Sequence, residues 1–131
     1  MRYLGIDYGH KRIGIALSDE GGRMAFPLTE LSAEFGNFVK EIRKIIKKES
    51  VGKIIIGLPI TFGGKESFQT QAVREFGEEL KKMLQLPMEY ENEILSTKLA
   101  ERGGSPKSKI NASAAAVILQ SFLDRHFDSS A

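Results

Sequence analysis

Residues 1–19 read MRYLGIDYGHKRIGIALSD, and this stretch decides the fold. Two strand-like runs, Tyr3–Ile6 and Arg12–Asp19, flank a short segment of turn-forming residues. Gly9 lies in that segment, and glycine can adopt the positive φ that a tight reversal needs. The stretch therefore predicts an antiparallel β-hairpin with Asp7 at the end of its first strand.

Asp7 is the candidate functional residue of this hairpin. A buried carboxylate without a partner is costly, so a strand that ends in an acid must provide a partner for it. A metal ion, a cation or water could serve this purpose at Asp7. The alternative is a turn residue, because aspartate commonly bonds to the backbone two residues further on. The hairpin by itself leaves both interpretations open.

The hairpin resembles the amino-terminal signature of the YqgF family, the Holliday-junction-resolvase-like proteins with an RNase H-type fold. The matching motif runs Gly5-Ile6-Asp7-Tyr8-Gly9-His10-Lys11-Arg12-Ile13-Gly14-Ile15-Ala16-Leu17-Ser18-Asp19. A second match lies at Ile56–Pro59 and a third at Ala115–Gln120. The three motifs stand in the family's order and spacing and cover nearly the whole chain. The shorter Asp-x-Gly pattern alone also occurs in sugar kinases and actin-like ATPases.

Composition sets outer bounds on the kind of protein. The chain has 131 residues, which suits a single domain over residues 1–131 with a sizeable core. It contains no cysteine, which excludes disulfides and thiolate metal sites. No apolar run approaches the length of a membrane span, and the first strand follows Met1 without a signal peptide, so we expect a soluble cytoplasmic protein. The 19 basic and 17 acidic residues give a net charge of +2, too mild by itself to indicate nucleic-acid binding.

The rest of the chain predicts alternating strands and helices. Pro27 indicates that the third strand has a free side or a bulge, since proline cannot donate to a ladder. A helix between the hairpin and the next apolar run makes a crossover, so that run should lie parallel to the first strand. The expected elements are an antiparallel strand at Met24–Leu31, a helix at Phe35–Ile46 with a cationic solvated face, a buried strand at Val51–Leu58 ended by Pro59, a helix at Phe68–Leu84 with Phe68 on its apolar stripe, a short strand at Pro87–Glu91 and a helix at about Asn111–Phe127.

These elements and the resemblance together predict an α/β fold of the RNase H-like type. We expect a five-stranded mixed sheet, with three antiparallel strands followed by two parallel ones and helices on both faces. The loop Thr61–Lys65 follows the carboxyl end of a parallel strand, where ligands of open α/β sheets bind. It is therefore a candidate edge of the substrate site.

The end of the last strand carries a second acid. Glu93 aligns with the family's glutamate, so the resemblance implies a role as metal ligand or general base, although the neighbouring Asn92 and Ile94 depart from the family pattern. Glu91 and Glu93 should share one face if the strand persists that far, because strand side chains alternate. The alternative for Glu93 is an exposed loop acid.

Asn111 is the most informative departure from the family, which places its third carboxylate there. An amide oxygen can ligate a hard cation but brings no negative charge, so metal binding should be weaker. At a helix start asparagine caps as well as aspartate, so the fold should tolerate the change. Whether Glu91, Asp19 or Glu101 substitutes as a ligand stays open at this point.

The resemblance implies a metal-dependent nuclease that acts on structured nucleic acid. Asp7 and Glu93 would hold Mg²⁺ or Mn²⁺, with Asn111 as a weak third member of the catalytic set. The family is linked to the 5′ end of 16S ribosomal RNA precursors and to Holliday-junction-like DNA, and we place the RNA first. The expected phosphate contacts come from four basic residues, which are Lys11, Arg12, Lys107 and Lys109.

Two other classes of protein fit parts of the sequence. A nucleic-acid-binding module that has lost cleavage would explain Asn92 and Asn111 together. An actin-like or sugar-kinase-like ATPase would explain the Asp-x-Gly hairpin, but those enzymes close two such domains around the nucleotide and this chain has the length of one. From the sequence we expect no membrane partner. The sequence does not distinguish a monomer from a homodimer.

Overall fold

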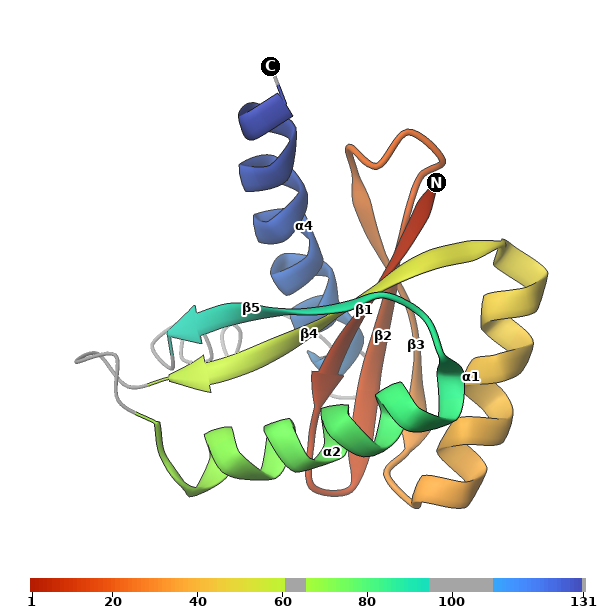
Figure 1. Cartoon of the computed structure of the whole chain (residues 1–131), viewed down its shortest axis with the longest axis vertical. Helices are drawn as coiled ribbons and strands as arrows, with labels where there is room; N and C mark the ends of the chain where they lie inside the picture. Colours follow the sequence, from red (N-terminus) through yellow and green to blue (C-terminus); the bar gives the residue numbers. More distant parts are fainter. Residues whose placement is uncertain (61–65, 95–109, 131) are drawn as a thin grey trace.

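The predicted hairpin forms the first two strands of a five-stranded sheet in the computed structural model, which describes residues 1–60, 66–94 and 110–130 (Figure 1). The strand order is β3-β2-β1-β4-β5, and β1 pairs antiparallel with β2 and parallel with β4. The elements are β1 (Arg2–Tyr8), β2 (Arg12–Ser18), β3 (Ala25–Ser32), α1 (Phe35–Glu49), β4 (Val51–Ile60), α2 (Phe68–Leu84), β5 (Met88–Ile94) and α4 (Ile110–Ser130). The expected mixed sheet of three antiparallel strands followed by two parallel ones is confirmed.

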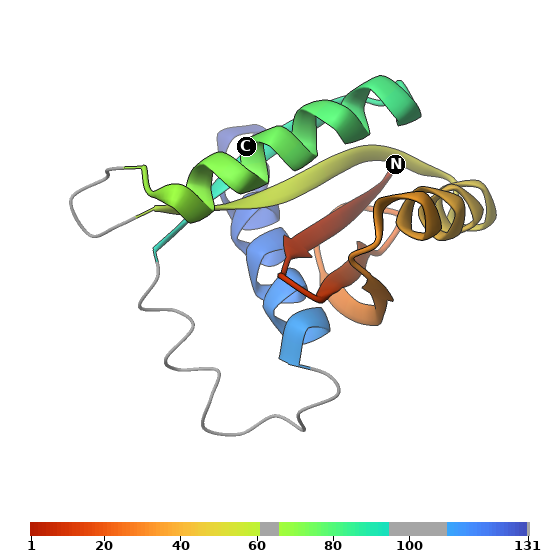
Figure 2. The ribbon, with the colours of Figure 1, turned by 90° about the horizontal axis from the view of Figure 1, so that it is seen from below.

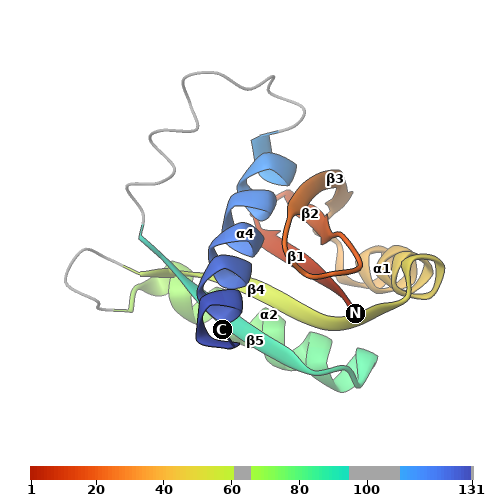
Figure 3. The ribbon, with the colours of Figure 1, turned by 90° about the horizontal axis from the view of Figure 1, so that it is seen from above.

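The helices lie on both faces of the sheet, as expected. Helices α1 and α2 cover one face, and α4 crosses the other (Figures 2 and 3). Strand side chains alternate between the faces. Leu4 and Ile6 therefore pack toward α1 and α2, whereas Gly5 and Asp7 face α4. The larger core lies between the sheet and the first two helices, and it includes Ile13, Ile15, Phe38, Ile42, Ile54, Ile56, Val73, Phe76 and Leu80.

Local capping explains where α1 and α2 begin and end. The Glu34 carboxylate accepts backbone N–H bonds at the start of α1, from Gly36 at 2.5 Å and from Asn37 at 3.3 Å. Ser67 and Thr70 form a reciprocal capping box at the start of α2. Each helix is followed by one residue in the left-handed region, with φ of 55° at Ser50 and at Gln85.

Helix α4 packs unusually close to the sheet because the strands beneath it carry glycines. A Cβ added to Gly5 would lie 2.8 Å from Leu119 Cβ, and one added to Gly57 would lie 2.5 Å from Ile118 Cδ1. A Cβ on Gly14 would collide with the carbonyl of Asn111. Small residues on α4 fit the same arrangement, with Ala112, Ala114 and Ala115 buried against the strands. The first turn of α4 thus lies directly on the backbone of β2.

The edge strand behaves as Pro27 predicted. β3 is the outer strand of the sheet, and its register against β2 shifts between Ile15 and Ala16, just where Pro27 begins to pair. Proline costs no ladder bond at such a position because one side of the strand lacks a neighbour. Among the described helices, none is both long and apolar enough to span a membrane.

Three local expectations from the sequence were wrong, and a fourth gave a strand that was too short. Pro59 does not end β4, which continues to Ile60, because Pro59 still pairs with Glu93 of β5. Phe68 is not part of the apolar stripe of α2, since it is the first residue of the helix and is 95% exposed. Asn111 does not cap α4 but is its second residue. The short strand expected at Pro87–Glu91 also extends further, to Ile94.

The contact between Gly14 and α4 makes a testable prediction for stability. Gly14→Ala should lower the free energy of unfolding by about 1–3 kcal/mol, because the new methyl group overpacks against the Asn111 backbone and pushes α4 off the sheet. Urea denaturation measures this change. Gly21→Ala is the matched control, because a Cβ there meets only Asp19 Oδ2 at 3.8 Å. Equal losses in the two variants would contradict close packing at Gly14.

Candidate active site

Asp7 lies between two glycines on the sheet face that α4 covers. It is 4% exposed and pairs with Gly14 of β2. The other neighbour of β1 is β4, where Ile56 pairs with Ile6. The next residue along β4, Gly57, therefore lies beside Asp7. The two neighbouring strands thus place no side chain next to the carboxylate. Atoms of α4 lie over both glycines instead, with the Asn111 carbonyl over Gly14 and the Ile118 side chain over Gly57.

Glu93 reaches the same place from β5. It is 7% exposed, and the alternation of the strand puts it on the same face as Glu91, as the sequence predicted. A Cβ on Gly57 would lie 3.2 Å from Glu93 Oε2, so the carboxylate extends over the Gly57 backbone. Because Gly57 stands beside Asp7, the structure brings the two predicted acids together on one side of the sheet.

Glu91 is bonded to α4. Its carboxylate accepts a hydrogen bond of 3.0 Å from the Ser121 hydroxyl and pairs with the Arg125 guanidinium. The carboxylate is buried at the junction of β5 and α4. Glu91 therefore ties the last strand to the last helix, and these bonds account for its buried charge.

Asn111 lies beyond Asp7, over the turn between β1 and β2. Its side-chain Nδ2 is 4.0 Å from the place that a Cβ on Gly9 would occupy. Its backbone N–H, one of those that an α-helix start leaves without an intrahelical acceptor, donates to Glu30 Oε2 at 3.1 Å. A carboxylate from β3 therefore performs the capping that the sequence had assigned to Asn111 itself.

Glu30 is the site residue that sequence reasoning missed. It pairs with Gly14, which pairs in turn with Asp7, so both acids face α4. Besides the Asn111 N–H, its carboxylate lies 3.8 Å from Arg12 Nε. Regular counting back from the turn between β2 and β3 would pair Gly14 with Thr29. The register shift between Ile15 and Ala16 is what places Glu30 in one row with Asp7, and a count of residues does not give it.

The basic residues predicted to contact phosphates are only partly within the described chain. Lys11 and Arg12 lie exposed at the turn that follows Asp7, and the Arg12 side chain is 62% exposed. Lys107 and Lys109 lie outside the described residues, as do Glu101 and the loop Thr61–Lys65.

Asp19 is not a member of the site. It directly follows β2, at the end of the strand that lies away from Gly14. Its carboxylate accepts backbone N–H bonds from Arg23 at 2.8 Å and Met24 at 3.1 Å. These bonds hold the pKa of the Asp19 carboxyl below its ordinary value. Its role is to close the turn between β2 and β3.

The chemistry of Asp7 and Glu93 fits a hard divalent cation. Both carboxylates are buried on the face that α4 covers, and the Glu93 carboxylate extends over the Gly57 backbone beside Asp7. Within the described ranges, no three histidine, cysteine or acidic side chains gather closely enough to hold a metal ion. Mg²⁺ does not require three, because it is commonly bound by one or two carboxylates together with water and substrate phosphates.

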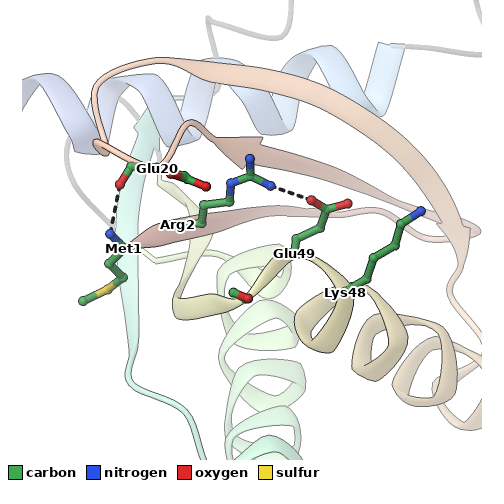
Figure 4. A pocket seen from close by; sticks show the side chains of 6 residues that line it. Met1, Arg2, Glu20, Lys48 and Glu49 are labelled. Carbon is green, nitrogen blue, oxygen red and sulfur yellow. Dashed lines mark hydrogen bonds and ion pairs between the residues drawn. The ribbon is translucent and has the colours of Figure 1, made fainter.

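A cavity of about 310 Å³ lies at the other end of β1 (Figure 4). The Met1 ammonium donates to the Glu20 carbonyl oxygen at 2.9 Å, and the Arg2 guanidinium pairs with Glu49 at 2.5 Å. The cavity also contacts Lys48 and Ser50 at the end of α1. Since Arg2 begins β1 and Asp7 stands near its carboxyl end, this cavity is separate from the acids of the candidate site.

Comparisons with known proteins identify the family of this chain. A family model described as RuvX, Holliday junction resolvase, matches residues 1–125. A protein of Caldanaerobacter subterraneus subsp. tengcongensis with the provisional name pre-16S rRNA nuclease is 40% identical over 134 residues, which cover 95% of this chain and 96% of that protein. A protein of Syntrophus aciditrophicus with the same name is 41% identical over 133 residues, covering 95% and 89%.

A solved structure shows the same fold at low sequence identity. RuvC of Thermus thermophilus, in complex with a Holliday junction substrate, superposes with a TM-score of 0.58 at 12% identity and covers 97% of this chain and 96% of its own. That likeness identifies the fold as RNase H-like, as the sequence predicted. Because the family match and the relatives span nearly the whole chain, this chain belongs to the RuvX family of Holliday junction resolvases.

Proposed function

We propose that the protein is a metal-dependent nuclease that cuts phosphodiester bonds in structured nucleic acid. The observation that carries the proposal is that Asp7 and Glu93 are both buried on one face of the sheet, with Gly57 beside Asp7 and beneath the Glu93 carboxylate. Buried carboxylates that converge in this way are typical of sites for hard cations in phosphoryl-transfer enzymes. The cytoplasm is the proposed place of action.

The proposed substrate is the 5′ end of a 16S ribosomal RNA precursor, with Holliday-junction-like DNA second. Relatives at 40% and 41% identity, aligned over nearly their full length, carry the name pre-16S rRNA nuclease. The family description names the Holliday junction instead. We place the RNA first because the relatives supporting it align closely along almost the entire chain.

Asp7 and Glu93 are the proposed ligands of Mg²⁺ or Mn²⁺, and the Asn111 side chain stands nearby as a weaker, neutral donor. When bound, such a cation supplies an activated water and stabilises charge on the phosphate oxygens. Burial of the two carboxylates strengthens their attraction for a cation, because less solvent screens them. The protein thus contributes fixed negative charge on one side of the scissile phosphate.

The basic residues are the proposed contacts to the nucleic-acid backbone. Lys11 and Arg12 are exposed at the turn beside the acids, and Lys107 and Lys109 precede α4 in the sequence. Contacts to phosphates fix the position of a strand without reading its sequence. Their proposed role is therefore to present one phosphodiester bond of a folded substrate to Asp7 and Glu93.

The metal site makes a testable prediction. Mn²⁺ should raise the melting temperature of the native protein, and should raise it less in Asp7→Asn and in Glu93→Gln, because each change removes one charge from the ligands. Cleavage of a labelled RNA that spans the 5′ end of a 16S precursor should fall by about 100-fold or more in both variants. Glu91→Gln is the matched control: it changes a buried acid on the same strand and face, but one bonded to Ser121 and Arg125.

The outcomes separate the possible functions. Equal Mn²⁺ shifts in all four proteins would refute the assignment of Asp7 and Glu93. Cleavage of a four-way DNA junction without cleavage of the RNA would reverse the order of substrates. Tight binding of either nucleic acid without any cleavage in Mn²⁺ would identify a binding module. A rise in melting temperature on adding ATP alone would favour the ATPase class.

The neutral residue at position 111 gives a second prediction. Asn111→Asp should tighten Mn²⁺ binding and speed cleavage, because it adds a charge beside the proposed site. Its effect on stability should be small: a negative charge near a helix start contributes about 0.3–1 kcal/mol, but Asp7 and Glu30 repel it in the metal-free protein. Calorimetric titration with Mn²⁺ measures the change in affinity.

Asn92→Asp is the control. It adds the same charge on an exposed residue of the opposite face of β5, and should leave the affinity for Mn²⁺ unchanged. Equal gains in both variants would show a general effect of net charge.

A further inference from the structure

Glu30 connects two parts of the protein that the proposed function uses. Its side chain is only 10% exposed although β3 is an edge strand. One carboxylate oxygen accepts the Asn111 N–H at 3.1 Å, and the other lies 3.8 Å from Arg12 Nε. A single acid therefore contacts both the first turn of α4 and the arginine that follows the β1–β2 turn.

We propose that Glu30 is a positioning residue, which holds Arg12 in the orientation that meets a substrate phosphate and fixes the start of α4 at the same point. The proposal rests on the proposed function, because it takes a nucleic-acid phosphate as the ligand of Arg12. Glu30 itself touches neither the substrate nor the metal. It acts through its two neighbours.

Strand register explains why Glu30 can make both contacts. Glu30 pairs with Gly14, and Arg12 stands two residues earlier on β2, on the same face. Diagonal neighbours of this kind are roughly 7–8 Å apart at their backbones, within reach of two long side chains. Gly14 has no side chain between them, and the Asn111 backbone lies directly above Gly14. The Glu30 carboxylate is therefore enclosed between the helix start and the guanidinium.

The orientation of Arg12 has a physical value for binding. A guanidinium has five N–H donors, and a contact at Nε does not use the four on the terminal nitrogens, which suit a phosphate. An arginine held in advance loses less side-chain freedom when the substrate binds. The ion pair by itself adds little stability, because Arg12 is 62% exposed. Its contribution is to the affinity for substrate and not to the rate of the chemical step.

The bond to Asn111 can be separated from the ion pair by choice of substitution. Glu30→Gln keeps an oxygen that accepts the Asn111 N–H but removes the charge that attracts Arg12. Glu30→Ala removes both contacts. Amide hydrogen exchange at Asn111 should therefore be close to native in Glu30→Gln and faster by about tenfold or more in Glu30→Ala. Equal exchange in the native protein and both variants would overturn the part of the proposal that concerns α4.

A double-mutant cycle tests the coupling to Arg12. The measurement is the affinity for the labelled precursor RNA in Ca²⁺, together with kcat and KM in Mn²⁺, for the native protein, Glu30→Gln, Arg12→Ala and the double variant. Glu30→Gln should weaken binding by about threefold to tenfold and raise KM while kcat stays within about twofold. In the Arg12→Ala background the same change should have no further effect, because the residue it positions is gone. Glu41→Gln removes an exposed ion pair with Lys44 on α1, and should leave both constants unchanged.

The proposal depends on whether Glu30→Gln weakens RNA binding, and on whether its loss adds to that of Arg12→Ala. Tighter RNA binding by Glu30→Gln would mean that Glu30 acts as a repulsive charge, and would overturn the proposal. Losses that simply add in the double variant would do the same. If the native protein binds neither the RNA nor a four-way DNA junction, the proposed function fails, and the role of Glu30 toward a phosphate fails with it. Binding that Arg12→Ala leaves unchanged would overturn the role of Glu30 toward Arg12 and leave the proposed function standing.

Discussion

The close contact between α4 and the backbone of the sheet is the constraint on which the rest of the structure depends. Each of the three central strands places one glycine under the helix: Gly5 on β1, Gly14 on β2 and Gly57 on β4. A methyl group at any of them would meet helix atoms at 3.0 Å or less. The helix therefore lies close to the sheet, and its first turn covers Gly14, which pairs with Asp7 near the carboxyl end of β1.

Two of these glycines, Gly14 and Gly57, lie in one row across the sheet with three acids. Along it, acids alternate with glycines in the order Glu30, Gly14, Asp7, Gly57, Glu91. The outer two acids bond to α4, one at its first turn and the other at Ser121 and Arg125. The central one, together with Glu93, forms the proposed metal site. Carboxylates thus attach α4 at the two edges of the row, and at its centre they form the proposed ligand site.

The sequence predicted the parts of this arrangement that depend on periodicity. The hairpin, the parallel crossover and the shared face of Glu91 and Glu93 follow from alternation and from the order of elements. Phe68 and Pro59 were misjudged because both stand at the ends of elements, where the pattern alone does not fix burial or pairing. Glu30 was missed because its importance comes from the register of β3 and from the position of α4, a helix far away in the sequence. Asp7 and Glu93 were assigned as partners through the family resemblance, since no local pattern joins two acids on different strands.

The contact between Gly14 and Asn111 also has a consequence for how the protein is made. Translation delivers β1 and β2 first and α4 last, so the strands leave the ribosome with their glycine face uncovered. Contacts between segments this far apart form late and make folding slow. The nascent chain carries Asp7 for nearly the whole of this period, and Glu93 for the last part of it, without the helix that covers their face of the sheet. The complete face with the proposed metal site can therefore form only after the codons for α4 have been read.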